Sequence, residues 1–270
     1  MLRYSFIVMD RLASFSTPAF HDALQTLRDC GYEGVELNLT EPTGLDLNQV
    51  ARWTRELNLQ VPSWLTGEAY SDGLCLSSAD PAIRRATVER LIRYLDVAEQ
   101  FGSILVVGLL QGLRRDEPDA LIAGARIREG LRRLADAAER KGIEIVIEPV
   151  NHLQVGFHNS VAEVKALIAA VNSPSVKPMI DTLHMNIEEK SLRRPILDCG
   201  SALRHVHLCD SNGGEFGSGH VDFSEALRAL DDAGYSGFAS VKVYRHLGFE
   251  AAARTSIEYL RSIEDRGGGG

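Results

Sequence analysis

The 270-residue sequence contains no apolar run of about 18 residues, so we expect no helix that crosses a membrane. Its N-terminus passes directly into a strand-like pattern and lacks the apolar core and cleavage site of a signal peptide. The four cysteines, Cys30, Cys75, Cys199 and Cys209, form neither a CxxC motif nor a dense disulfide framework. These absences predict a cytoplasmic protein with reduced thiols.

The sequence also lacks an excess of positive charge and a glycine-rich phosphate-binding motif. Its formal net charge is −8, which argues against a nucleic-acid partner because phosphate binding requires a basic surface. No GxGxxG follows the first strand-like segment, which argues against a doubly wound nucleotide-binding sheet. No Pro/Gly-rich linker divides the chain, so we expect one domain over residues 1–266 and a flexible glycine tail at 267–270.

What the sequence does contain is a regular alternation of strand-like and helix-like segments. Short apolar, β-branched runs are each followed by apolar residues at helical spacing, for example Val88, Leu91 and Leu95. Eight such units in a chain of this length predict a (β/α)₈ TIM barrel of the α/β class. The predicted strands are 5–9, 34–39, 60–65, 103–109, 144–150, 177–181, 205–209 and 238–244.

Capping residues mark the predicted helix boundaries. Ser16-Thr17-Pro18, Asp80-Pro81 and Asn159-Ser160 are typical of helix N-termini. Glycines at positions 31, 102, 142 and 234 fall between a helical stretch and the next strand, where a left-handed residue commonly ends a helix.

Polar residues end the last four predicted strands. In (β/α)₈ barrels the active site lies at the C-terminal strand ends, and here these are Glu148, Asp181, His207 and Lys242 in order. Glu148 could instead be a solvated loop carboxylate, Asp181 a helix cap, and either His207 or His205 a structural histidine. Because carboxylates and imidazoles bind divalent cations, their shared location favours a metal site formed by Glu148, Asp181 and His207. A protonated lysine cannot be a ligand.

Three further residues near the predicted rim are candidates for substrate contacts. Glu36 could bind substrate hydroxyls or pair with a cation. Trp64 could stack on the apolar face of a sugar or pack in the core. Arg245 would favour an anionic substrate, but strand alternation turns it inward only if the strand has already ended.

Several segments resemble the xylose isomerase-like barrels, especially the ketose 3-epimerases, and together they span most of the chain. The most specific match is the run Asp-Thr-x-His-Met-Asn-Ile-Glu-Glu within 180–189. The others are Glu148-Pro-Val-Asn, His205-Val-His-Leu-Cys-Asp-Ser-Asn212, Gly31-Tyr-Glu-Gly-Val-Glu-Leu37 and Gly217-Ser-Gly-His-Val-Asp-Phe223.

The resemblance implies one Mn²⁺, Mg²⁺ or Co²⁺ ion, with Mn²⁺ preferred, held by Glu148, Asp181, His207 and a second Glu. It implies that a proton leaves a sugar carbon beside the carbonyl through a metal-bound enediolate, with two Glu residues serving opposite faces. His184 would contact a substrate oxygen. The family likeness also implies a homo-oligomer, either a dimer or a tetramer.

Three positions depart from the family pattern. Lys242 stands in place of the second ligand Glu, and Gly213 stands in place of an Arg. Gln154 stands in place of the second acid of the fifth loop, and we expect Gln154 to contact substrate. Lys242 could stabilise negative charge, act as a general acid or base, or form a Schiff base with a carbonyl. It could also pair with Glu148 or Asp181 and replace the metal.

We therefore predict a metal-dependent isomerase or epimerase-type enzyme acting on a sugar or keto-polyol, with Glu148 as base and Lys242 as acid or charge stabiliser. One alternative is a metal-dependent lyase, such as a decarboxylase of a keto sugar acid. Another is a metal-free sugar-binding barrel in which Lys242 neutralises the carboxylates. A nuclease is disfavoured because the strand ends supply too few histidines for a multi-zinc site.

Overall fold

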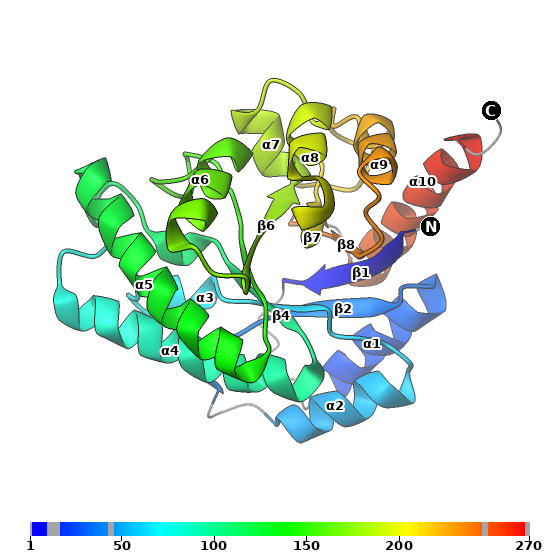
Figure 1. Cartoon of the computed structure of the whole chain (residues 1–270). Coiled ribbons are helices and arrows are strands. Elements are labelled where there is room, and N and C mark those ends of the chain that lie inside the picture. The colour runs from blue at the N-terminus through cyan, green and yellow to red at the C-terminus, as the bar shows by residue number, and fades with distance from the viewer. Residues whose placement is uncertain (1, 10–16, 43–45, 245–247, 268–270) are drawn as a thin grey trace. The chain divides into compact units, whose positions relative to one another are not determined.

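The protein, described by a computed structural model over residues 2–9, 17–42, 46–244 and 248–267, has eight parallel strands whose sequential order closes into a barrel. This confirms the predicted (β/α)₈ fold, and Figure 1 labels its elements. The strands are β1 Arg3–Val8, β2 Gly34–Asn38, β3 Ser63–Leu65, β4 Ile104–Val107, β5 Ile145–Ile147, β6 Val176–Asp181, β7 His205–Leu208 and β8 Phe238–Val241.

Most strand residues are buried, as expected for parallel strands covered on both faces. Every residue of β4 and β5 is buried. Several strands end earlier than the sequence predicted. As a result, Glu148 directly follows β5 and Lys242 directly follows β8, whereas Asp181 is the last residue of β6 and His207 lies within β7.

The predicted helix caps are present. Thr17, Asp80 and Ser160 each accept a hydrogen bond from a backbone N–H of the first turn. Glycines 31, 102 and 142 adopt the left-handed conformation directly after α1, α4 and α5. The helices are α1 Pro18–Cys30, α2 Leu47–Glu56, α3 Glu68–Ser71, α4 Pro81–Phe101, α5 Ala120–Lys141, α6 Val161–Val171, α7 Thr182–Glu188, α8 Arg193–Cys199, α9 Phe223–Asp232 and α10 Phe249–Gly267, with short 3₁₀ turns η2 Leu109–Gln111 and η3 Gly200–Ala202.

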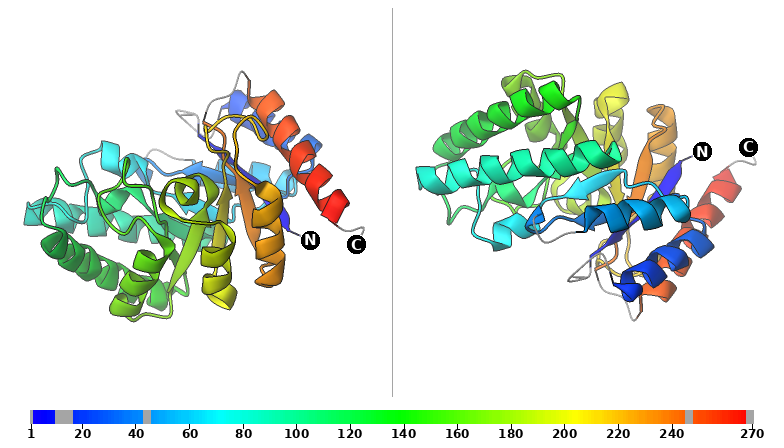
Figure 2. Two further views of the ribbon diagram at one scale, coloured as in Figure 1. Left: turned by 90° about the horizontal axis from the view of Figure 1, so that it is seen from above. Right: turned by 90° about the horizontal axis from the view of Figure 1, so that it is seen from below.

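Contacts divide the chain into two compact units, the first of residues 1–36, 44–62 and 180–270. Within this unit α1 and α10 lie side by side (Figure 2). The Tyr32 hydroxyl donates to the carbonyl of Ala253 at 2.8 Å, and Phe249 meets the ring of Phe6 edge-on with centroids 5.4 Å apart. The last helix is therefore anchored to the first βα unit.

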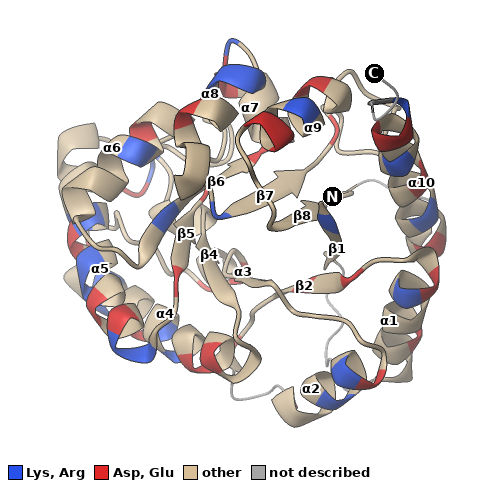
Figure 3. Ribbon diagram, turned by 45° about the vertical axis from the view of Figure 1, so that its right-hand side comes forward, with Lys and Arg blue, Asp and Glu red and all other residues tan. Residues whose placement is uncertain are grey.

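The second unit comprises residues 37–43 and 63–179. Its long helices α4 and α5 pack against each other, with Leu91, Leu95, Leu131 and Leu134 fully buried. Lys and Arg residues are interspersed with Asp and Glu along these two helices, whereas the strands are mostly uncharged (Figure 3). This is the pattern expected when the polar helix faces meet solvent and the strands form the core.

The C-terminal boundary differs slightly from the sequence prediction. Helix α10 ends at Gly267, the first residue of the predicted glycine tail, and 268–270 lie outside the described residues. None of the helices in the described part of the chain has the length and apolar character needed to span a bilayer.

Candidate functional site

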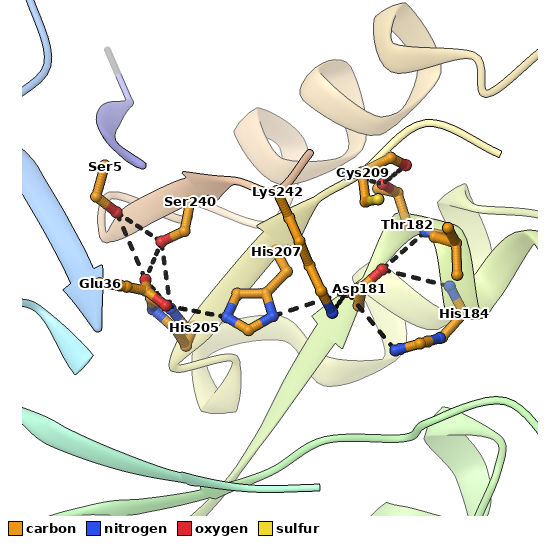
Figure 4. A network of polar contacts seen from close by, with 11 residues as sticks. Ser5, Glu36, Asp181, Thr182, His184, His205, His207, Cys209, Ser240 and Lys242 are labelled. Carbon is orange, nitrogen blue, oxygen red and sulfur yellow. Dashed lines mark hydrogen bonds and ion pairs between the residues drawn. The ribbon is translucent and has the colours of Figure 1, made fainter. Parts of the chain in front are cut away.

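Asp181 is at the centre of the polar residues in the first unit. It ends β6 and also caps α7, because its Oδ1 accepts the backbone N–H groups of Leu183 at 2.8 Å and His184 at 3.3 Å. Its Oδ2 accepts from Lys242 Nζ at 2.7 Å (Figure 4). The carboxylate thus serves as the helix cap considered from sequence. Its second oxygen still faces Lys242 and His207, which together with Asp181 form the strand-end cluster.

Lys242 extends from the end of β8 to reach that oxygen. Only 6% of the residue is exposed, and its backbone N–H donates to the carbonyl of Leu208 at 2.8 Å, which fixes where the side chain begins. The ammonium also lies 5.2 Å from the centre of the Tyr244 ring, within cation–π range. Burial alone would raise the pKa of Asp181, but the Lys242 ammonium and the neighbouring imidazoles hold that pKa well below its ordinary value.

His207 lies between two carboxylates. Its Nε2 is 3.1 Å from Oε2 of Glu36, a hydrogen-bond distance, whereas its Nδ1 is 3.7 Å from Oδ2 of Asp181, which is too long for one. The ring has no exposed surface. The imidazole therefore bonds Glu36 through Nε2 and turns Nδ1 toward Asp181.

Glu36 is fully buried rather than placed on a solvent-facing rim. Its Oε1 accepts from His205 Nε2 at 2.6 Å and from the hydroxyl of Ser240, while Ser5 lies 3.5 Å away and hydrogen-bonds Ser240 at 2.6 Å. Burial alone would raise the pKa of Glu36, but the charges and hydrogen bonds of His205 and His207 lower it. Both serines went unrecognised in the sequence, although each is a small polar residue inside an apolar strand.

Two sets of atoms in this unit have spacings compatible with a cation. Glu36, His205 and His207 each offer a ligand atom, all within 4.8 Å of one another. The 3.7 Å between Asp181 Oδ2 and His207 Nδ1 also suits two ligands of one ion, because bonds of about 2.1 Å place adjacent ligands roughly 3.0–3.7 Å apart. A carboxylate oxygen has two lone pairs, so Oδ2 can accept from Lys242 and still bind an ion. The donor chemistry therefore fits a divalent cation.

Glu148 belongs to the second unit, where it is 6% exposed. Its N–H donates to the Val107 carbonyl at 3.0 Å, and its carbonyl accepts from Gln111 Nε2 at 3.2 Å. Gly108 gives the carboxylate its space, since a Cβ there would lie 2.5 Å from Glu148 Oε2. Gln111 also pairs with His158 Nδ1 at 2.9 Å, and burial lowers the pKa of that histidine. Sequence inspection did not single out Gly108 or Gln111.

The remaining predicted residues differ in their surroundings. His184 is buried on α7, with Nε2 3.8 Å from Asp181 Oδ2. Gln154 is exposed in a turn. Trp64 has no exposed surface and packs edge-on against Phe101 of α4 at 5.1 Å, so its contacts support core packing over stacking on a sugar. Arg245 lies outside the described residues.

Asp210 organises the loop after β7 and was also missed. Its carboxylate accepts backbone N–H groups from Ser211, Gly217, Gly219 and Val221 at 2.7–3.2 Å. The side chain is 1% exposed. The family-like run at 217–223 is therefore folded around one buried carboxylate, and a Cβ on Gly219 would collide with that carboxylate.

Comparison with known proteins places this site in a family. The family model described as xylose isomerase-like TIM barrel matches residues 24–263. A ketose 3-epimerase of Arthrobacter globiformis is 32% identical over 83% of this chain and 77% of its own length. An L-ribulose 3-epimerase of Methylomonas sp. is 32% identical over 77% of this chain and 72% of its own.

A solved structure gives the same result at the level of fold. The D-allulose 3-epimerase of Methylomonas sp., in complex with D-allulose, superposes with a TM-score of 0.82 at 26% identity, covering 97% of this chain and 96% of that one. The chain belongs to the xylose isomerase-like TIM barrel family and, through these relatives, to its sugar epimerase and isomerase enzymes.

Proposed function

We propose that the protein interconverts ketose-type sugars by proton transfer at a carbon next to the carbonyl. The observation that carries this proposal is the buried pair of Lys242 and Asp181 at the ends of β8 and β6, in a chain 32% identical to a ketose 3-epimerase. The pair supplies a positive group where negative charge develops in such a reaction. D-allulose and L-ribulose, named in the relatives, define the substrate class to test first.

The chemistry requires a base and a stabiliser of negative charge. Glu148 removes the proton from the carbon beside the carbonyl, and the electron pair moves onto the carbonyl oxygen to give an enediolate. The Lys242 ammonium hydrogen-bonds this oxygen. When the proton leaves C3, its return to the opposite face of C3 gives the epimer. When the proton leaves C1, its delivery to C2 gives the aldose isomer. With Gln154 in place of a second acid, one carboxylate suffices for the second outcome.

A divalent cation completes the proposed site. Glu148, Asp181 and His207 would hold it, with Mn²⁺, Mg²⁺ or Co²⁺ all suited to these ligands. When bound, such an ion polarises the substrate carbonyl and neighbouring hydroxyl, which makes the adjacent C–H more acidic. His184, buried beside Asp181, is placed to orient a substrate oxygen.

The direct test is proton exchange in deuterated water with ketoses, followed by NMR, with Mn²⁺ and with a chelator. We expect deuterium at the carbon beside the carbonyl together with an epimer or aldose. Glu148→Gln should abolish exchange, while Glu144→Gln, at the other end of β5, should retain it. Absence of exchange for all ketoses tested, with metal present, would contradict the proposal.

A second candidate is a lyase acting on a keto sugar acid. The buried ammonium of Lys242 favours it, because a cation can bind a substrate carboxylate and stabilise the enediolate left after CO₂ departs. Release of CO₂ without deuterium exchange on ketoses would support the lyase over the isomerase. One ion per chain in elemental analysis is expected for either enzyme, whereas none would favour the metal-free sugar-binding alternative.

The family likeness also leads us to propose a cytoplasmic homo-oligomer, a dimer or tetramer. The mass of the purified protein measured by light scattering distinguishes these assemblies from a 29.6 kDa monomer.

A further inference from the structure

A closed set of buried hydrogen bonds connects four strands of the first unit. Ser5 of β1, Glu36 of β2, His205 and His207 of β7 and Ser240 of β8 are each at most 1% exposed. Figure 4 shows them meeting at the Glu36 carboxylate, to the left of the pair formed by Asp181 and Lys242, with His207 between the two groups. Five polar side chains in an apolar interior are costly unless each is satisfied, so their arrangement determines which atom carries which hydrogen.

The strand register places Ser5, His207 and Ser240 at the same height along the barrel strands. Ser240 pairs with Ser5 on β1 and with His207 on β7. Side chains two residues apart on a strand share a face, which brings His205 to the same side as His207. Glu36 reaches all four by its two carboxylate oxygens, although it lies 169 residues from His205 in the chain.

The donors and acceptors present determine which ring nitrogen of each histidine carries the hydrogen. A carboxylate only accepts, so His205 and His207 must each donate through Nε2, at 2.6 Å and 3.1 Å, one to each oxygen of Glu36. Ser240 donates to the oxygen that His205 uses, and Ser5 can donate to Ser240 at 2.6 Å. His207 is therefore the ring bound to Oε2, with its hydrogen on Nε2.

The competing arrangement would put the hydrogen of His207 on Nδ1, facing Asp181. That contact is 3.7 Å, longer than a hydrogen bond, and the Asp181 oxygen concerned already accepts from Lys242 at 2.7 Å. Glu36 is the better acceptor, because its oxygen lies 3.1 Å from Nε2, whereas the Asp181 oxygen lies 3.7 Å from Nδ1. A hydrogen on Nδ1 would also block that nitrogen as a ligand.

We infer that Glu36 is a positioning residue that holds His207 as the Nε2–H tautomer, so that the Nδ1 lone pair is directed toward Asp181 for a divalent cation. The use of Nδ1 rests on the proposed function, whereas the tautomer stands on the geometry of Glu36 alone. His205, Ser5 and Ser240 occupy the other carboxylate oxygen and keep Glu36 from turning away. Glu36 thus acts on the site through His207 without touching substrate.

The tautomer can be measured directly. Long-range ¹H–¹⁵N NMR of ¹⁵N-histidine-labelled protein, recorded above the imidazole titration range, distinguishes a protonated from a lone-pair ring nitrogen. We expect His207, assigned by comparison with His207→Gln, to show a protonated Nε2 and a lone-pair Nδ1. A protonated Nδ1, or a cation on Nε2 that removes its hydrogen, overturns the inference.

The positioning role is tested with Glu36→Gln, whose amide can donate as well as accept. We expect His207 to lose its single Nε2–H form and Co²⁺ affinity, measured by calorimetry, to fall by about 10–100-fold. Glu33→Gln, an exposed carboxylate just before β2, should change neither. An unchanged tautomer and affinity in folded Glu36→Gln would overturn the role. Inactivity on every ketose with the expected tautomer would contradict the proposed function and leave this inference standing.

Discussion

At the scale of single residues, the chemistry of the site depends on how buried charges are paired. Asp181 and Lys242 compensate each other at 2.7 Å with almost no exposed surface. Such a pair adds little over an apolar replacement, but removal of one partner leaves an isolated buried charge. The position of the Glu148 carboxylate depends instead on packing, because any side chain larger than that of glycine at position 108 would overlap with Oε2.

Lys242→Met should lower the free energy of unfolding by about 3–5 kcal/mol at neutral pH, because Asp181 loses its buried cation. Urea denaturation measures the loss. Asp181 has a depressed pKa in the folded state, so its stabilisation is complete above the unfolded value of about 3.9 and is lost as pH falls toward the folded value. The difference between the two proteins should therefore shrink in acid.

The control for this prediction is Lys141→Met, which removes a surface lysine paired with Asp96 and Glu99. Surface pairs contribute little, so its effect should be much smaller. Equal losses in the two variants would show that burial of Lys242 is not what makes its pair important.

Gly108→Ala should strongly reduce activity while the fold is retained. The added methyl would lie 2.5 Å from Oε2 of Glu148 and 3.1 Å from Val150, so the carboxylate must move. Turnover of a ketose should fall by roughly 100-fold, since a displacement near 1 Å costs about that much. Gly124→Ala on α5, where a Cβ meets nothing within 4 Å, is the control and should keep full activity. Full activity in Gly108→Ala would exclude Glu148 as the base.

At the scale of elements, loops are held by single buried carboxylates as well as by backbone pairing. Asp210 collects four backbone N–H groups from the β7–α9 loop, and Asp181 caps α7 while it belongs to the strand-end cluster. Asp181 therefore couples the position of a short helix to the site.

Asp210→Ala should unfold the β7–α9 loop locally. Hydrogen bonds to a charged group contribute about 1.5–3 kcal/mol each, so we expect a loss of at least ~3 kcal/mol. Hydrogen exchange at the amides of Gly217, Gly219 and Val221 should accelerate first. Asp231→Asn, an exposed carboxylate on α9, should leave exchange unchanged. Equal protection of these amides in Asp210→Ala would contradict the central role of this carboxylate.

At the scale of the whole molecule, the C-terminal elements pack against the N-terminal ones. The last strand pairs with the first, and α10 covers α1. Deletion of residues 249–270 should abolish the cooperative thermal transition, because the buried Ile257 and Leu260 each contribute about 1.5–3 kcal/mol against a total stability of roughly 5–15 kcal/mol. The contact of Phe249 with the ring of Phe6 is lost as well. Deletion of 268–270 alone should keep the transition. A cooperative transition in both proteins would show that α10 is dispensable.

Much of this architecture was predictable because its signals are local. Apolar runs, Thr17-Pro18, Asp80-Pro81 and left-handed glycines specify where strands and helices begin and end, whatever the rest of the chain does. Strand ends were overestimated, because buried apolar residues such as Val150 continue into the loops beyond the strands.

The sequence by itself determined the order of strands and helices and the placement of Glu148, Asp181, His207 and Lys242 at strand ends, since periodicity and capping act between residues close in the chain. Only the tertiary structure decided that Lys242 binds Asp181 and that Glu36 lies between two histidines. Those contacts join residues 61 to 171 positions apart. No local pattern encodes them, because strands distant in sequence meet only when the barrel closes.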